Sequence, residues 1–165
     1  MNGLVSTEWL AGALGAPDLR IVDVRWYLDP RKVGRDAYEG GHIPGAKNLA
    51  FSALVAADGT LRPRNELITL FQQAGIDLET PVVTSCGSGV TACALLLALE
   101  VVGHRTHAVY DGSWTEWGGR TDTPVAVGPD SVHLNQRGHD LIAQSLASWL
   151  VSAIRPETVA SDAPA

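Results

Sequence analysis

Apolar residues occur along this chain in short runs that alternate with longer amphipathic stretches. The short runs are rich in β-branched residues and have the length of buried strands. They span residues 20–24, 47–50, 81–83 and 107–110. The longer stretches place apolar residues three and four positions apart, as helices do. They span residues 6–14, 64–74, 92–103 and 135–154. Strands that alternate with helices predict an α/β fold, in which helices cover both faces of a parallel sheet.

Local signals predict where the first helix begins and which faces are buried. Ser6 can cap the first helix, and its apolar face would carry Trp9 and Leu10. In the long apolar helix near the middle of the chain, we expect Cys93 to face the core. Residues 26–41 are polar and rich in turn-forming residues, so they predict a loop.

The apolar periodicity stops at residues 121–129, where Pro124 and Pro129 predict a linker. An amphipathic helix follows the linker, and a short polar stretch ends the chain. We therefore expect a globular domain over residues 1–128, an appended helical tail over 129–154 and a disordered end over 155–165.

Composition limits the classes of function. The 165 residues are 45% hydrophobic, which is enough for one domain core. A net charge of -6 without a cluster of lysines or arginines argues against nucleic-acid binding. No apolar run reaches membrane-spanning length and no basic leader begins the chain, so we expect no membrane partner and a cytoplasmic protein. We expect no cofactor and no metal site.

One stretch, Thr84–Thr91, joins a predicted strand to a predicted helix and contains Cys86. The first amides of a helix are unpaired and point into such a turn, where the helix dipole favours an anion. Gly87 and Gly89 would let these amides converge without obstruction by a Cβ atom. Because helix N-termini lower thiol pKa values, we interpret Cys86 as an activated nucleophile. The alternative is that Cys86 is a small buried core residue.

A phosphatase-type enzyme also places its cysteine in an amide-lined loop between a strand and a helix. Such a loop needs an arginine whose guanidinium binds phosphate through bidentate hydrogen bonds. Position 92 is alanine, and no arginine lies between Cys86 and Leu99. The sequence therefore disfavours phosphate chemistry.

Four segments together resemble the rhodanese family, and within it the 3-mercaptopyruvate sulfurtransferases. They are Ile21–Arg25, Gly41–Ala46, Ser85–Cys93 and Val109–Trp114, within residues 4 to about 128. The resemblance implies a rhodanese-like three-layer fold with a parallel sheet. It also implies a sulfurtransferase in which Cys86 takes a sulfane sulfur to form a persulfide. The acceptor would then be a thiol, a thioredoxin-like protein or cyanide.

The resemblance also implies that the residues after the cysteine stabilise the persulfide, through their amides and through two side-chain hydroxyls. These residues are Gly87, Ser88, Gly89, Val90 and Thr91. A ring of uncharged donors suits a persulfide anion, because it holds the charge without a counter-ion. Family members that prefer thiosulfate carry cations just after the cysteine, so the neutral loop favours 3-mercaptopyruvate.

A keto acid needs a cation for its carboxylate, and arginine offers two parallel donors. Arg35 matches the position of one substrate-binding arginine in the mercaptopyruvate enzymes. The second has no clean match, and Arg31 and Arg25 are the candidates. Asp36 could stand for an acidic residue of those enzymes. His42 is a candidate base, although a hydrogen-bonded structural histidine is the favoured interpretation.

The two halves of the chain resemble different domains of these enzymes. Mercaptopyruvate enzymes are similar to two rhodanese domains in tandem, of which the second is catalytic. Here the residues before Gly41 resemble the first domain, and those from Lys47 onward resemble the second. We hypothesise that a deletion between the repeats produced the chain. A non-catalytic persulfide carrier or interaction module is therefore the alternative to an enzyme.

A second, conflicting signature lies in the tail. Asp130 and His133 resemble the last block of SGNH (GDSL-type) hydrolases, in which such a pair orients and activates a serine. The block that carries the nucleophile is missing, as are the oxyanion-hole blocks. We therefore expect a fused fragment and not an esterase.

Overall fold

The computed structural model describes residues 3–25, 34–128 and 133–134, and it gives only the backbone of 34–36 and 133–134. The predicted helix over 135–154, the predicted disordered end and the candidate Arg31 lie outside the described residues. The division at residue 128 into a domain and a helical tail therefore stays a prediction.

A four-stranded parallel sheet runs through the molecule in the strand order β2-β1-β3-β4. Its strands are β1 (Arg20–Asp23), β2 (Lys47–Asn48), β3 (Val82–Ser85) and β4 (His107–Val109). Leu4 adds a parallel bridge to Val109 at the β4 edge. In the register of the two central strands Asp23 lies beside Ser85, so β1 and β3 end together at one edge of the sheet. In open α/β sheets, functional groups gather beyond this carboxyl edge.

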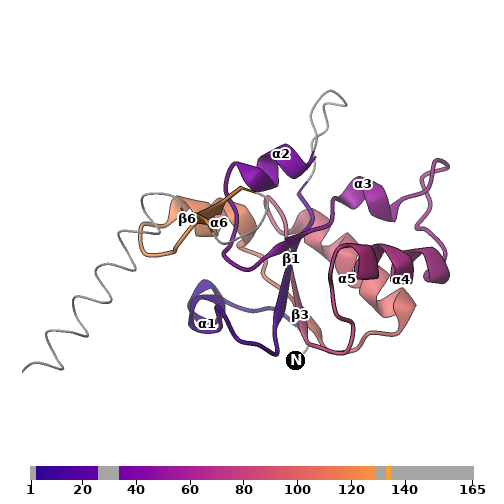
Figure 1. Cartoon of the computed structure of the whole chain (residues 1–165), viewed down its shortest axis with the longest axis horizontal. Helices are drawn as coiled ribbons and strands as arrows, with labels where there is room; N and C mark the ends of the chain where they lie inside the picture. The colour runs from indigo at the N-terminus through magenta and orange to yellow at the C-terminus, as the bar shows by residue number, and fades with distance from the viewer. Residues whose placement is uncertain (1–2, 26–33, 129–132, 135–165) are drawn as a thin grey trace, which may run out of the picture.

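Helices cover both faces of the sheet (Figure 1), which confirms the predicted three-layer α/β fold. One face packs against α3 (Phe51–Leu54), α4 (Arg64–Gln73) and α5 (Val90–Val102). The other face carries α1 (Thr7–Gly12) and α6 (Ser113–Gly119). The two faces bury separate cores, because successive strand residues point to opposite sides of a sheet. Val22 and Val82 belong to the first core, whereas Ile21 and Val83 belong to the second.

Four short elements lie where the sequence predicted none. Helix α2 (Gly34–Glu39) lies within the predicted loop, α3 follows β2, and β5 (Ala126–Val127) lies within the predicted linker. Strand β5 pairs antiparallel with the fourth element, β6 (His133–Leu134), and Ala126 and His42 exchange backbone hydrogen bonds of 2.9 and 3.0 Å. The linker prediction was wrong, because Ala126 also pairs with His42, which lies far away in the sequence.

Helix α1 begins as predicted, with the Ser6 hydroxyl accepting the N–H of Trp9 at 3.2 Å. Leu10 is fully buried, but Trp9 is 44% exposed, so its assignment to the apolar face was wrong. Among the described residues, no helix has the length and apolar character needed to cross a bilayer.

Candidate active site

The buried strand β3 leads directly into the loop that carries Cys86. All four residues of β3 are buried, and α5 begins after Gly89. Cys86 therefore lies at the carboxyl edge of the sheet and at the N-terminus of a 13-residue helix, as the sequence predicted. Only 1% of Cys86 is exposed, so the sulfur is held within the loop rather than projecting into solvent.

Several hydrogen-bond donors converge on the sulfur of Cys86. The N–H of Gly89 lies 3.1 Å from Sγ. Burial raises the pKa of the thiol, but the hydroxyl of Thr91 and the N–H groups of Ser88, Ala92 and Gly89 lower it by more, so the pKa lies below that of an ordinary cysteine. The charged thiolate, which is the nucleophilic form, is therefore favoured here. Among the described residues, no basic side chain is one of the groups that lower this pKa.

The two loop glycines have different roles. Gly89 has φ = 86°, and a Cβ atom there would lie 2.6 Å from the carbonyl oxygen of Asp111. Gly89 is therefore required both by its backbone conformation and by the close approach of the chain. A Cβ at Gly87 would meet nothing within 4 Å, and the φ of Gly87 is not in the left-handed region. Our expectation that both glycines are needed to remove obstruction was therefore wrong for Gly87.

The start of α6 holds the backbone of the loop. Ser113 is fully buried with φ = 49°, and its hydroxyl accepts the N–H of Cys86 at 3.0 Å while it donates to Tyr110 O at 2.8 Å. Trp114 N–H donates to Cys86 O at 2.9 Å. Thr115 donates to Gly87 O from its N–H at 2.9 Å and from its hydroxyl at 2.7 Å. We assigned no role to these three residues from the sequence, where the segment Val109–Trp114 contributed only to a family resemblance.

A buried ion pair between Arg25 and Asp23 lies next to Trp114. Arg25 donates from Nε to Asp23 Oδ2 at 2.8 Å and from Nη2 to Gly41 O at 2.5 Å. Its guanidinium carbon lies 4.6 Å from the ring centroid of Trp114. Asp23 also accepts the backbone N–H of Arg25 at 2.9 Å, so its carboxylate has a structural role. Because the Arg25 guanidinium is committed to these partners, the geometry does not favour it as a ligand for a substrate carboxylate.

The structure describes the remaining candidate site residues to different extents. His42 is fully buried, stacks on Tyr38 with ring centroids 3.8 Å apart, and has Nδ1 2.8 Å from Tyr38 O. This arrangement supports the structural interpretation of His42. The backbones of Arg35 and Asp36 lie in α2, and nothing about their side chains is described.

Cys93 lies on the exposed side of α5, where its Sγ is 3.6 Å from Gly89 O. Our prediction that Cys93 faces the core was wrong, because α5 packs through another arc. The buried residues of that arc are Ala92, Leu95, Ala98, Leu99 and Val102. Cys86 and Cys93 are both free. Among the described residues, no group of three or more potential ligands could hold a metal ion.

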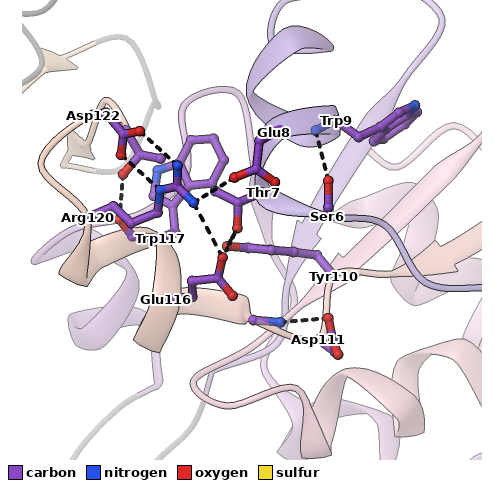
Figure 2. A network of polar contacts seen from close by, with 12 residues as sticks. Ser6, Thr7, Glu8, Trp9, Tyr110, Asp111, Glu116, Trp117, Arg120 and Asp122 are labelled. Carbon is purple, nitrogen blue, oxygen red and sulfur yellow. Dashed lines mark hydrogen bonds and ion pairs between the residues drawn. The ribbon is translucent and has the colours of Figure 1, made fainter.

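A polar network connects α6 to α1 (Figure 2). Thr7 hydrogen-bonds both Tyr110 Oη, at 2.8 Å, and the carboxylate of Glu116. Arg120 pairs with Glu8 at 2.7 Å, and it also binds the carboxylate of Asp122. The helix whose first residues hold the Cys86 loop is therefore itself anchored to the N-terminal helix.

Comparisons with known proteins agree with this geometry. The profile of the family described as "Rhodanese-like domain" matches residues 6–120. The 3-mercaptopyruvate sulfurtransferase of Rattus norvegicus is 45% identical over 107 residues, covering 63% of this chain and 36% of the relative. The thiosulfate sulfurtransferase of Gallus gallus is 39% identical over 97 residues, covering 54% of this chain and 34% of the relative.

The crystal structure of SseA from Escherichia coli, described as a 3-mercaptopyruvate sulfotransferase, superimposes with a TM-score of 0.55 and 35% identity. The match covers 69% of this chain and 41% of SseA. The chain spans only about a quarter to a third of the length of these curated relatives, and 24% of a thiosulfate/3-mercaptopyruvate sulfurtransferase of Arabidopsis thaliana. The likeness of Asp130 and His133 to SGNH hydrolases gains no support from the family match, which ends at residue 120.

Proposed function

This chain belongs to the rhodanese-like family, and on that premise we propose that it is a sulfurtransferase that carries a sulfane sulfur on Cys86. The observation that supports this most is the convergence of uncharged donors on a thiol whose pKa lies below its ordinary value. Burial opposes ionisation of the thiol, but the hydrogen bonds from Thr91 and the loop amides outweigh it. The same donors can hold the negative sulfur of a persulfide.

The transfer takes two displacements at sulfur. The Cys86 thiolate attacks the sulfur of 3-mercaptopyruvate, a sulfur–sulfur bond forms, and the carbon–sulfur bond breaks. Its electron pair leaves on carbon as the enolate of pyruvate, which takes up a proton. An acceptor thiolate or cyanide then attacks the outer sulfur and releases the Cys86 thiolate, so no external oxidant or reductant is needed. With thiosulfate as donor, the leaving group is sulfite.

Two features favour 3-mercaptopyruvate as the donor. No side chain between Cys86 and Thr91 is charged, so the loop offers no cation to the dianionic thiosulfate. Arg35 is our candidate ligand for the carboxylate of the keto acid, with Arg31 as a second and Asp36 as an accompanying acid. A thiol, cyanide or a thioredoxin-like protein would be the acceptor, and a cytoplasmic location stays a prediction.

A persulfide carrier is the second candidate function. One observation favours it: Cys86 is only 1% exposed, so its sulfur is held within the loop. A carrier would hold sulfur delivered by a partner protein but would not turn over a small donor.

Mass spectrometry of the protein after incubation with 3-mercaptopyruvate or thiosulfate tests the proposal. We expect one added sulfur in the peptide that contains Cys86, its removal by cyanide, and no addition in Cys86→Ser. Replacing Arg35 by alanine should raise the KM for 3-mercaptopyruvate and leave thiosulfate kinetics almost unchanged. If neither donor adds sulfur to the native chain, the enzyme is excluded and only the carrier remains. If the added sulfur persists in Cys86→Ser, the assignment of the nucleophile is wrong.

A further inference from the structure

The backbone carbonyl of Gly87 is held by two hydrogen bonds, although Gly87 lies in a loop. Its carbonyl oxygen accepts two hydrogen bonds from one residue of α6, the N–H of Thr115 at 2.9 Å and the hydroxyl of Thr115 at 2.7 Å. The Thr115 side chain is exposed and lies outside both buried cores. A single surface side chain therefore restrains one peptide group of the candidate active site.

The planarity of the peptide group connects this contact to the sulfur. In a trans peptide the C=O of one residue and the N–H of the next point in opposite directions. The carbonyl of Gly87 points to α6, so the N–H of Ser88 points away from α6. Hydrogen bonding by that N–H is one cause of the lowered pKa of the Cys86 thiol, and the N–H of the next residue, Gly89, lies 3.1 Å from Sγ. The position of Thr115 thus controls a donor that Thr115 itself does not contact.

The identity of residue 87 makes this restraint necessary. Glycine has the widest choice of backbone torsions, so a peptide plane beside it rotates easily unless it is held. Nothing lies within 4 Å of the position that a Cβ of Gly87 would occupy, so no packing contact there restrains the plane. The preceding carbonyl, of Cys86, is held by Trp114 N–H at 2.9 Å, which leaves Thr115 to fix the next peptide.

We propose that Thr115 is a positioning residue for the nucleophile: its hydroxyl and N–H hold the Gly87 carbonyl and thereby aim the Ser88 N–H at the sulfur of Cys86. Thr115 touches neither the sulfur nor a substrate, and it acts through the orientation of one peptide plane. The inference deepens the proposed function, because a correctly aimed amide would stabilise both the thiolate and the persulfide.

The test compares Thr115→Val, which keeps the shape of the side chain but removes its hydroxyl, with Thr115→Ser, which keeps the hydroxyl. Both are made in a Cys93→Ser background, so that only Cys86 reacts with iodoacetamide. The rate of alkylation is followed against pH and normalised to its plateau at high pH. Access to the buried thiol changes the plateau, whereas ionisation changes the midpoint.

We expect Thr115→Val to move the midpoint to higher pH and to lower the normalised rate at neutral pH by roughly threefold, the effect of losing one hydrogen bond. Thr115→Ser should restore the native midpoint, and all three proteins should melt within a few degrees of one another because Thr115 lies outside the cores. An unchanged midpoint in Thr115→Val, or a midpoint in Thr115→Ser that matches Thr115→Val, would overturn the proposal.

The alkylation profile needs no sulfur donor, so it separates this inference from the proposed function. If the midpoint shifts but the native chain never takes up sulfur, the sulfurtransferase proposal fails and the positioning role stands. If the native chain and Thr115→Val form the persulfide equally fast and their midpoints coincide, only the positioning role fails.

Discussion

Replacing Gly89 by alanine tests the loop geometry directly, because two independent features of the structure oppose a side chain at this position. The φ angle of 86° lies in the left-handed region, which costs a residue with a Cβ atom about 1–2 kcal/mol. The new Cβ would also lie 2.6 Å from Asp111 O and 3.2 Å from Asp111 Cα, and backbone atoms cannot rotate away as a side chain can. Relieving such overpacking costs about 1–3 kcal/mol.

Together these effects predict that Gly89→Ala lowers the free energy of unfolding by about 2–5 kcal/mol, which in a chain of this length corresponds to a fall in melting temperature of about 5–20 °C. The matched control is Gly87→Ala in the same loop, where an added Cβ meets nothing within 4 Å. Its stability should change by less than about 1 kcal/mol. Thermal and urea unfolding, followed by circular dichroism, measure both variants.

The same substitution should also change the nucleophile. The amide of Gly89 lies 3.1 Å from Cys86 Sγ, so displacing it removes a donor that lowers the thiol pKa. Alkylation of Cys86 in Gly89→Ala should therefore need a higher pH than in Gly87→Ala. If Gly89→Ala melts together with Gly87→Ala and keeps the native alkylation profile, the reasoning about the close contact with Asp111 is refuted.

Two further predictions concern the residues around the loop. Arg25→Met leaves the buried carboxylate of Asp23 without its counter-ion and should lower the free energy of unfolding by about 3–5 kcal/mol, measured by urea unfolding. The double variant Arg25→Met/Asp23→Asn should lose less stability than Arg25→Met alone. If the losses of the two single variants simply add in the double variant, the pairing is contradicted. Burial raises the pKa of Tyr110 by more than the hydrogen bond with Thr7 lowers it, so the folded chain keeps the phenolic proton after the unfolded chain has lost it. The resulting stability is complete below the unfolded pKa of about 10 and is lost as pH rises through the folded value; Tyr110→Phe should remove that pH dependence, and equal slopes in the two proteins would exclude it.

The sequence alone predicted the strand, loop and helix around Cys86, because everything that defines them is local. A buried β-branched run, a glycine with freedom of torsion and an apolar helix follow one another within about twenty residues of the chain. The end of a helix offers free amides to any anion beside it, so the activation of the thiol also followed from the local order of elements. The alternation of strands and helices along the chain is also a local pattern, so it was sufficient to predict the three-layer fold.

Only the tertiary structure decided which residues support the loop from outside. Ser113, Trp114 and Thr115 reach Cys86 and Gly87 because β4 runs parallel to β3 and brings the next turn back to the same edge of the sheet. Propensity and periodicity describe neighbours along the chain, and they carry no information about a contact made through the sheet.

The exposed position of Cys93 has the same physical origin. Helix α5 is apolar around most of its surface, so the sequence does not show which arc is buried, and the packing of α3, α4 and the sheet selects one. The burial of Cys86 to 1% exposure likewise depends on residues distant in sequence, because Cys86 belongs to the core cluster that also contains Val24 and Leu49. Local sequence thus determined what the nucleophile is, whereas the path of the chain in three dimensions determined what holds it in place.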